Sequence, residues 1–184
     1  MKKLLIGSFV GAILLFGWQA VSWTAIGVHD NSFKYSPNQD SIMNFLEKNL
    51  AGDGEYLVPS ANPQLSKEEK RKQEEVLMTR PWAGVNFHRT HETDMPIIML
   101  KGFVNSLICV LLACLVIRKF DVRYKTFFSL FTAVLTFGVI SFLFIWYNQH
   151  NWFQTTWQFL WGEMVDDVIG WGLVGVWLGW YYRK

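Results

Sequence analysis

The sequence predicts an all-α membrane bundle of four transmembrane helices, with a small α/β extracytoplasmic insertion between helices 1 and 2. Three observations lead to this fold class. Four stretches approach the roughly 20 predominantly apolar residues that a bilayer-spanning helix requires. One long stretch between the first two of them is hydrophilic and charged. Of the two short segments that separate the last three stretches, one is basic and the other has no Lys or Arg.

The overall composition agrees with a chain of alternating character. Aromatic residues make up 17%, including 10 Trp and 15 Phe. Charged residues also make up 17%, below the roughly 25% of soluble domains. The mean hydropathy is only +0.16 because the charged stretch offsets the apolar ones. A net charge of +2, with dispersed basic residues, gives no basic patch for nucleic acid.

The four predicted spans divide the chain into three parts. These are the first span within residues 1–28, the hydrophilic insertion at 29–95, and the remaining spans within 96–184, at about 96–117, 126–147 and 159–182. The first span resembles a signal peptide in having Lys2 and Lys3 before its apolar run. However, it is long, and Trp18 or Trp23 would occupy the position where a cleavage site needs a small residue. We therefore expect a retained anchor.

The distribution of basic residues predicts the orientation of the spans, because short cytoplasmic segments are enriched in Lys and Arg. In a four-span chain, the basic residues near the span ends all fall on one side: Lys2, Lys3, Arg118, Lys119, Arg123, Lys125, Arg183 and Lys184. The short segment at 148–158 faces the other side and has none. We expect both termini to be cytoplasmic and the insertion at 29–95 to lie outside.

Within the insertion, local patterns predict two helices and two strands. Apolar residues recur at helical spacing over residues 40–50, and a short strand is expected at 55–58. Ser66 followed by Glu69 forms a capping-box pattern that opens a charged helix ending near Thr79. A second strand is expected at about 85–90. The insertion is therefore predicted to be a small α/β unit.

Polar residues inside the spans are the best candidate site, because such residues are costly in a membrane and usually face the bundle interior. At about 1.5 Å of rise per residue, three spans contribute polar groups to one layer, roughly 6 to 16 Å below the outer surface. The predicted buried polar cluster comprises Gln19, Lys101, Asn105, Glu163, Asp166 and Asp167.

Three interpretations of this cluster remain open. Lys101 could pair with one of the acids and lock the helix packing. Alternatively, three carboxylates outnumber one ammonium, and the surplus acid would suit a proton or cation relay, or a membrane-embedded active site. A third possibility is a site for a lipid or quinone headgroup.

The sequence predicts no cofactor, and its metal signal is weak. His88 and His91 are three residues apart near acidic residues, a composition that zinc accepts, but no third ligand is fixed by a motif. No predicted span contains a histidine for axial haem ligation. No phosphate-binding glycine loop or nucleophile–base arrangement is present, so the sequence favours a protein that is not an enzyme.

Both ends of the chain resemble a group of small, uncharacterised bacterial inner-membrane proteins. The first span carries Phe16, Trp18 and Trp23 as Phe-x-Trp-x₄-Trp. The last span carries Glu163-x-x-Asp166 followed by Ile169-Gly170-Trp171, and Tyr56 to Pro59 is similar to a strand of the same proteins. The resemblance implies a multi-pass protein of the bacterial inner membrane with a periplasmic insertion, and it implies no chemistry. This chain departs from the pattern by adding Asp167 beside Asp166.

Three functional hypotheses follow. The first is an accessory or structural subunit of a larger inner-membrane complex, whose partners are the lipid bilayer, other membrane subunits or further copies of the chain. The second is a small oligomeric proton- or cation-linked transporter or channel that uses Lys101, Glu163 and Asp166. The third is a membrane enzyme at the outer leaflet, with the same acids as proton donors or acceptors and His88 or His91 assisting.

Overall fold

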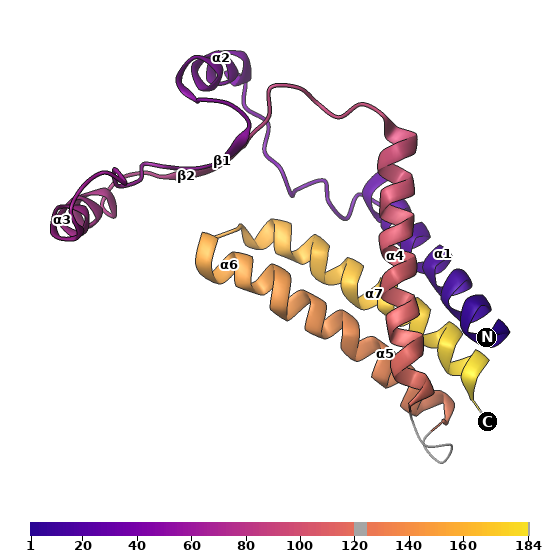
Figure 1. Ribbon diagram of the computed structural model, residues 1–184. Coiled ribbons are helices and arrows are strands. Elements are labelled where there is room, and N and C mark those ends of the chain that lie inside the picture. Colours follow the sequence, from indigo (N-terminus) through magenta and orange to yellow (C-terminus); the bar gives the residue numbers. More distant parts are fainter. Residues whose placement is uncertain (120–124, 184) are drawn as a thin grey trace. The chain divides into compact units, whose positions relative to one another are not determined.

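The computed structural model describes residues 1–119 and 125–183 and shows a mostly helical chain with a small two-stranded sheet (Figure 1). The chain divides into two compact units. The helical unit consists of Met1–Lys34 together with Asp94–Lys184, and the inserted unit is Tyr35–Thr93. The boundary therefore falls six residues later than the expected start at 29, because residues 29–34 belong to the helical unit.

The helical unit is built from four long helical segments. They are α1 (Lys2–Thr24), α4 (Met95–Arg118), a continuous run of α5 (Phe127–Ser141), the π-helix η2 (Phe142–Tyr147) and α6 (Asn148–Phe153), and α7 (Trp157–Tyr182). The run through α6 continues six residues beyond the predicted end at 147. Residues 154–156 connect it to α7, where Gln154 adopts a left-handed conformation with φ of 52°.

Three of these segments are long and apolar enough to cross a membrane: Lys2–Thr24, Met95–Arg118 and Phe127–Phe153. The 26-residue α7 has the length but is not among them. Its sequence carries Glu163, Asp166 and Asp167, which interrupt an otherwise apolar helix. The structure thus supports three candidate spans, and a fourth span formed by α7 remains a prediction.

Helices α1 and α7 lie at the centre of the packing of these four segments. Helix α7 packs against both α1 and α5, and α1 also packs against α4 (Figure 1). Their contacts enclose an apolar core that includes the fully buried Val110, Ile117, Leu130, Val174 and Leu178. Burial of these apolar side chains is the main contribution that contacts between its own helices make to the stability of the helical unit.

Close packing between α5 and α7 depends on a missing side chain. A Cβ atom at Gly138 of α5 would lie 2.5 Å from the backbone oxygen of Asp167 and 2.9 Å from Cβ of Trp171. Glycine therefore lets the two backbones approach, as small residues do between membrane helices.

The inserted unit contains the four predicted elements, with bounds within a few residues of those expected. They are α2 (Gln39–Asn49), β1 (Gly54–Val58), α3 (Lys67–Leu77) and β2 (Ala83–Phe87). The two strands pair antiparallel, with Gly54 opposite Phe87 and Val58 opposite Ala83. The predicted capping box is present, since Ser66 and Glu69 exchange side chain-to-backbone hydrogen bonds at the start of α3.

Candidate functional site: a buried histidine–aspartate pair

The most distinctive polar feature of the helical unit joins residues from opposite ends of the sequence. Nε2 of His29 lies 3.0 Å from Oδ2 of Asp166, and the two side chains are only 3% and 7% exposed. The second carboxylate oxygen, Oδ1, accepts a hydrogen bond of 3.0 Å from Nε1 of Trp18. Both oxygens of a buried carboxylate are therefore satisfied, which burial of a charge requires. The histidine clasp, as the name is used below, consists of His29, Asp166, Trp18 and Trp23.

A sharp turn after α1 places His29 in the clasp. Helix α1 ends at Thr24, and Gly27 then adopts φ of +69°, a left-handed conformation that favours glycine. A Cβ atom at Gly27 would also lie 2.6 Å from Oδ2 of Asp30. The next turn is closed by the backbone N–H of Ser32, which donates to the carbonyl of His29. His29 thereby becomes a buried residue although it lies outside any helix.

The imidazole ring is held on several sides. Trp23 stacks on it, with ring centroids 3.8 Å apart and planes 9° from parallel. Gly162 of α7 also faces the ring, and a Cβ atom there would lie 2.6 Å from Nδ1 of His29. Oγ of Ser32 lies 3.5 Å from the same Nδ1. A ring with neighbours at both nitrogens and a stacked face has little freedom to reorient.

The hydrogen-bond roles follow from the chemistry of the partners. An ionised carboxylate only accepts hydrogen bonds, so Nε2 of His29 donates to Asp166. The Ser32 hydroxyl can donate to Nδ1 when the imidazole is neutral.

Two further acids of α7 lie next to the clasp. Glu163 is 8% exposed, and it is one helical turn before Asp166 and Asp167, so that the three carboxylates share one end of the helix. Asp167 has the Ser141 side chain as a hydrogen-bonding neighbour. Among the described residues, however, its buried Oδ2 has no hydrogen-bond partner. Three carboxylates of α7 therefore lie in the same part of the bundle as the one imidazole of His29.

The π-helix η2 begins directly after Ser141. A π-helical turn changes the rotation of the residues that follow it, and such turns are frequent at functional sites. Here it marks the point where α5 passes the acidic end of α7. The regular apolar pattern of this segment gave no sign of it in the sequence.

The structure differs from the predicted cluster in three members. Gln19, Lys101 and Asn105 are exposed and do not join Glu163, Asp166 and Asp167. The reason is helical phase. On α4 the buried face is formed by residues such as Ser106, Val110, Ala113 and Ile117, and Lys101 and Asn105 lie outside this face. On α1 the inward positions belong to Trp18 and Ser22.

The basic member of the cluster is His29 rather than Lys101. No ion pair involving Lys101 is found within residues 1–119 and 125–183. His29 was assigned to the outer segment because it follows the apolar run of the first span. Gly27, two residues earlier, was the available signal, since a glycine there permits the chain to turn back.

The two weak metal candidates lie in the inserted unit. Nδ1 of His88 is 3.8 Å from Oδ2 of Asp53, and both side chains are more than half exposed. Throughout the described part of the chain, no three His, Cys, Asp or Glu side chains are grouped so that they could hold a metal ion. What the structure brings together at the clasp is a buried, hydrogen-bonded histidine–aspartate pair.

No protein-family model, curated protein or solved structure matches this chain.

Proposed function

We propose that the protein is an accessory or structural subunit of a larger bacterial inner-membrane assembly. In this proposal α7 is the fourth span, both termini are cytoplasmic, and the inserted unit is periplasmic. The resemblance of both ends of the chain to small bacterial inner-membrane proteins supports this proposal. The observation that carries it is the exposure of Lys101 and Asn105 on a helix that is otherwise suited to lipid.

The depth of Lys101 and Asn105 in the bilayer determines whether each side chain can reach the polar interface. Counted from Met95 at about 1.5 Å per residue, Lys101 lies about 9 Å and Asn105 about 15 Å along α4. The hydrocarbon core of a bilayer is about 30 Å thick, so Asn105 falls near its middle. The long side chain of Lys101 can reach the interface. The short amide of Asn105 cannot, and an unpaired amide in lipid is costly.

A helix of a partner subunit would supply a hydrogen-bonding group for the side-chain amide of Asn105. Lys101, Asn105, Ile108 and Leu112 are all exposed and recur every three or four residues, so they form one stripe along α4. Interhelical hydrogen bonds from Asn are among the contacts that join membrane helices. We infer that this stripe contacts a helix of another subunit or of a second copy.

Site-specific cross-linking tests the proposal. A photoreactive residue at position 108, between the two polar residues and Leu112, should produce protein cross-links in native membranes. The same residue at Val139 of α5, which is also exposed, is the matched control. Mild-detergent purification with mass spectrometry would then identify the partner. Cross-links to lipid alone from position 108, with a protein that purifies as a monomer, would reject the proposal.

The unpartnered oxygen of Asp167 favours a second candidate function, a proton- or cation-linked transporter or channel. In this alternative Glu163 and Asp167 carry the proton or cation, and His29 takes the part first assigned to Lys101. Proton flux into liposomes should then be lost in Glu163→Gln and Asp167→Asn but kept in Asp30→Asn, whose side chain is exposed. Equal flux in all three folded variants would exclude this alternative.

A further inference from the structure

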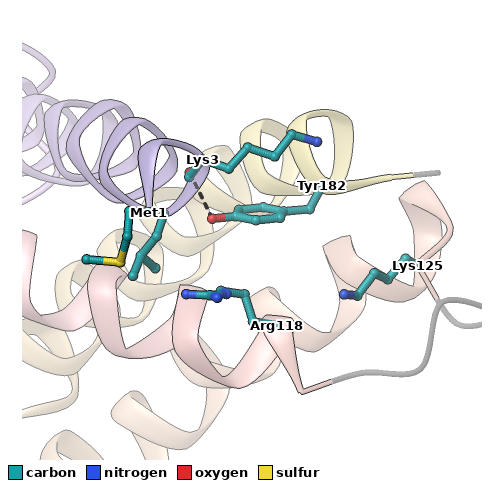
Figure 2. A pocket seen from close by; sticks show the side chains of 6 residues that line it. Met1, Lys3, Arg118, Lys125 and Tyr182 are labelled. Atoms are coloured by element: carbon teal, nitrogen blue, oxygen red, sulfur yellow. Dashed lines mark hydrogen bonds between the residues drawn. The ribbon is translucent and has the colours of Figure 1, made fainter.

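A small cavity with a basic lining opens at the end of the bundle where α1 begins and α4 and α7 end (Figure 2). Its volume is about 210 Å³, well above the roughly 10–15 Å³ that one water needs. The cavity is called the basic pocket below, and its lining residues are Met1, Lys3, Leu4, Arg118, Lys125 and Tyr182.

Two cationic side chains face the same side of the Tyr182 ring. Figure 2 shows Arg118, from the end of α4, and Lys125, which precedes α5, below this ring. Lys3 lies on the other side, and its Nζ is 5.6 Å from the centroid of the Tyr181 ring. The Tyr182 hydroxyl donates a hydrogen bond of 3.0 Å to the carbonyl of Lys3. This bond holds the Tyr182 ring in place between Lys3 and the other two cations.

No acidic side chain lines the basic pocket within residues 1–119 and 125–183. No ion pair involving Arg118 or Lys125 is found in the same part of the chain. Two cations beside one cavity repel each other unless an anion lies between them. An arginine with a nearby lysine is a combination that binds phosphate, because the guanidinium offers paired donors and the ammonium adds a point charge.

An apolar groove lies along the adjoining part of α1 and α4. Its volume is about 420 Å³, and it is lined by Leu5, Ile6, Ser8, Phe9, Val10, Leu107 and Leu111. On α1, Leu4 of the basic pocket and Ser8 of the groove are four residues apart, so the two linings share one helix face. On α4, Leu111 and Arg118 are seven residues apart and therefore share one helix face. The groove thus leads along both helices to the basic pocket.

We propose that the basic pocket and the apolar groove together bind one anionic phospholipid. The phosphate lies between Arg118 and Lys125, beside Tyr182, and an acyl chain occupies the groove along α1 and α4. A soluble phosphate would use the basic pocket alone. The continuous apolar groove is the feature that selects a lipid, since it offers a long apolar surface to a chain attached to the phosphate.

This lipid site is separate from the surface proposed for a partner subunit. The partner stripe contains Lys101, Asn105 and Ile108, whereas the lipid site uses Leu107 and Leu111. The two sets share no residue, although Ile108 and Leu111 are three residues apart on α4 and therefore adjoin. The two proposals are tested separately, the stripe by cross-linking from position 108 and the lipid site by lipid retention in the Arg118 and Lys125 variants.

Native mass spectrometry of the purified full-length chain tests the lipid site. The probes are dioleoyl phosphatidylglycerol, dioleoyl phosphatidylcholine and soluble glycerol phosphate. We expect phosphatidylglycerol to be retained in preference to phosphatidylcholine, and glycerol phosphate not to displace it. Arg118→Gln and Lys125→Gln should each weaken phosphatidylglycerol binding about fivefold, as expected for one basic contact to an anionic lipid.

The controls separate this site from general attraction to basic helix ends. Lys119→Gln removes an exposed neighbouring charge that does not line the pocket, and it should leave binding unchanged. Ile6→Trp fills the groove without altering charge, and it should weaken binding even if Arg118→Gln does not fold. Equal binding of the two lipids, equal loss in Lys119→Gln, or displacement by glycerol phosphate would overturn the proposal.

Discussion

Replacing Gly162 by Ala should destabilise the helical unit through the histidine clasp. The new Cβ atom would lie 2.6 Å from Nδ1 and 2.7 Å from Cε1 of His29, whereas ordinary contacts begin at 3.4 Å. The ring must therefore move by about 0.8 Å, the difference between 3.4 and 2.6 Å. A shift of that size is made at the expense of the 3.0 Å contact with Asp166 or of the stacking on Trp23.

The magnitude follows from two opposing effects. Overpacking of a filled site costs about 1–3 kcal/mol. Replacing Gly by Ala at an open helical position instead gains about 0.5–1 kcal/mol. Gly172 is the matched control in the same helix, because a Cβ atom there would meet no neighbour within 4 Å. Because the gain from replacing Gly by Ala is common to both variants, they should differ by the overpacking cost alone, about 1–3 kcal/mol in the free energy of unfolding.

The assay is reversible unfolding of the purified chain in mixed micelles, followed by tryptophan fluorescence. A second measurement assigns the loss to the clasp rather than to general crowding. In a His29→Ala background, Gly162→Ala should no longer destabilise, because the atoms it would meet are gone. If Gly162→Ala is as stable as Gly172→Ala, or if its cost persists without the imidazole, the proposed packing at the clasp is wrong.

Three other predictions concern contacts elsewhere in the chain. His29→Ala and Asp166→Asn should be non-additive, with a coupling of about 0.5–3 kcal/mol in a double-mutant cycle of unfolding, because each removes the other's partner. Gly138→Ala should cost about 1–3 kcal/mol in the same assay, since its Cβ would meet a backbone oxygen of α7 that cannot rotate away. Hydrogen bonds from Ser66 lower the pKa of Glu69 below its ordinary value, so they stabilise α3 above that ordinary pKa and are lost as the pH falls through the lowered one. Ser66→Ala should raise the pKa of Glu69 towards its ordinary value in an NMR titration, and an unchanged pKa would contradict this cause.

Much of the architecture could be predicted from local pattern alone. Three of the expected spans depend on length and apolar composition, which a sequence displays directly. The small α/β unit was predictable because its signals are also local, as at the capping box formed by Ser66 and Glu69. The continuation of the third span through α6 was missed because Asn148, Gln149 and His150 resemble a loop, although they extend the helix.

The composition of the candidate site was predicted only in part. Glu163 and Asp166 lie on one helix, so their spacing placed them together without tertiary information. Only the depth of Lys101 in its span suggested that it joins them, and depth does not determine which way a residue faces around its helix. His29 was missed for a different reason. Its position depends on a turn at Gly27 and on the space left by Gly162, which belong to segments far apart in the sequence.

The separation between His29 and Asp166 also has a consequence for biogenesis. The two residues are 137 positions apart in the chain. At a synthesis rate of about 5–20 residues per second, roughly 7 to 27 seconds pass between their appearance at the ribosome. During that interval Trp18 and His29 are already made, while Asp166, their common hydrogen-bond partner, is not. The clasp therefore closes only after most of the last helix has been synthesised, so the first helix reaches its final packing late.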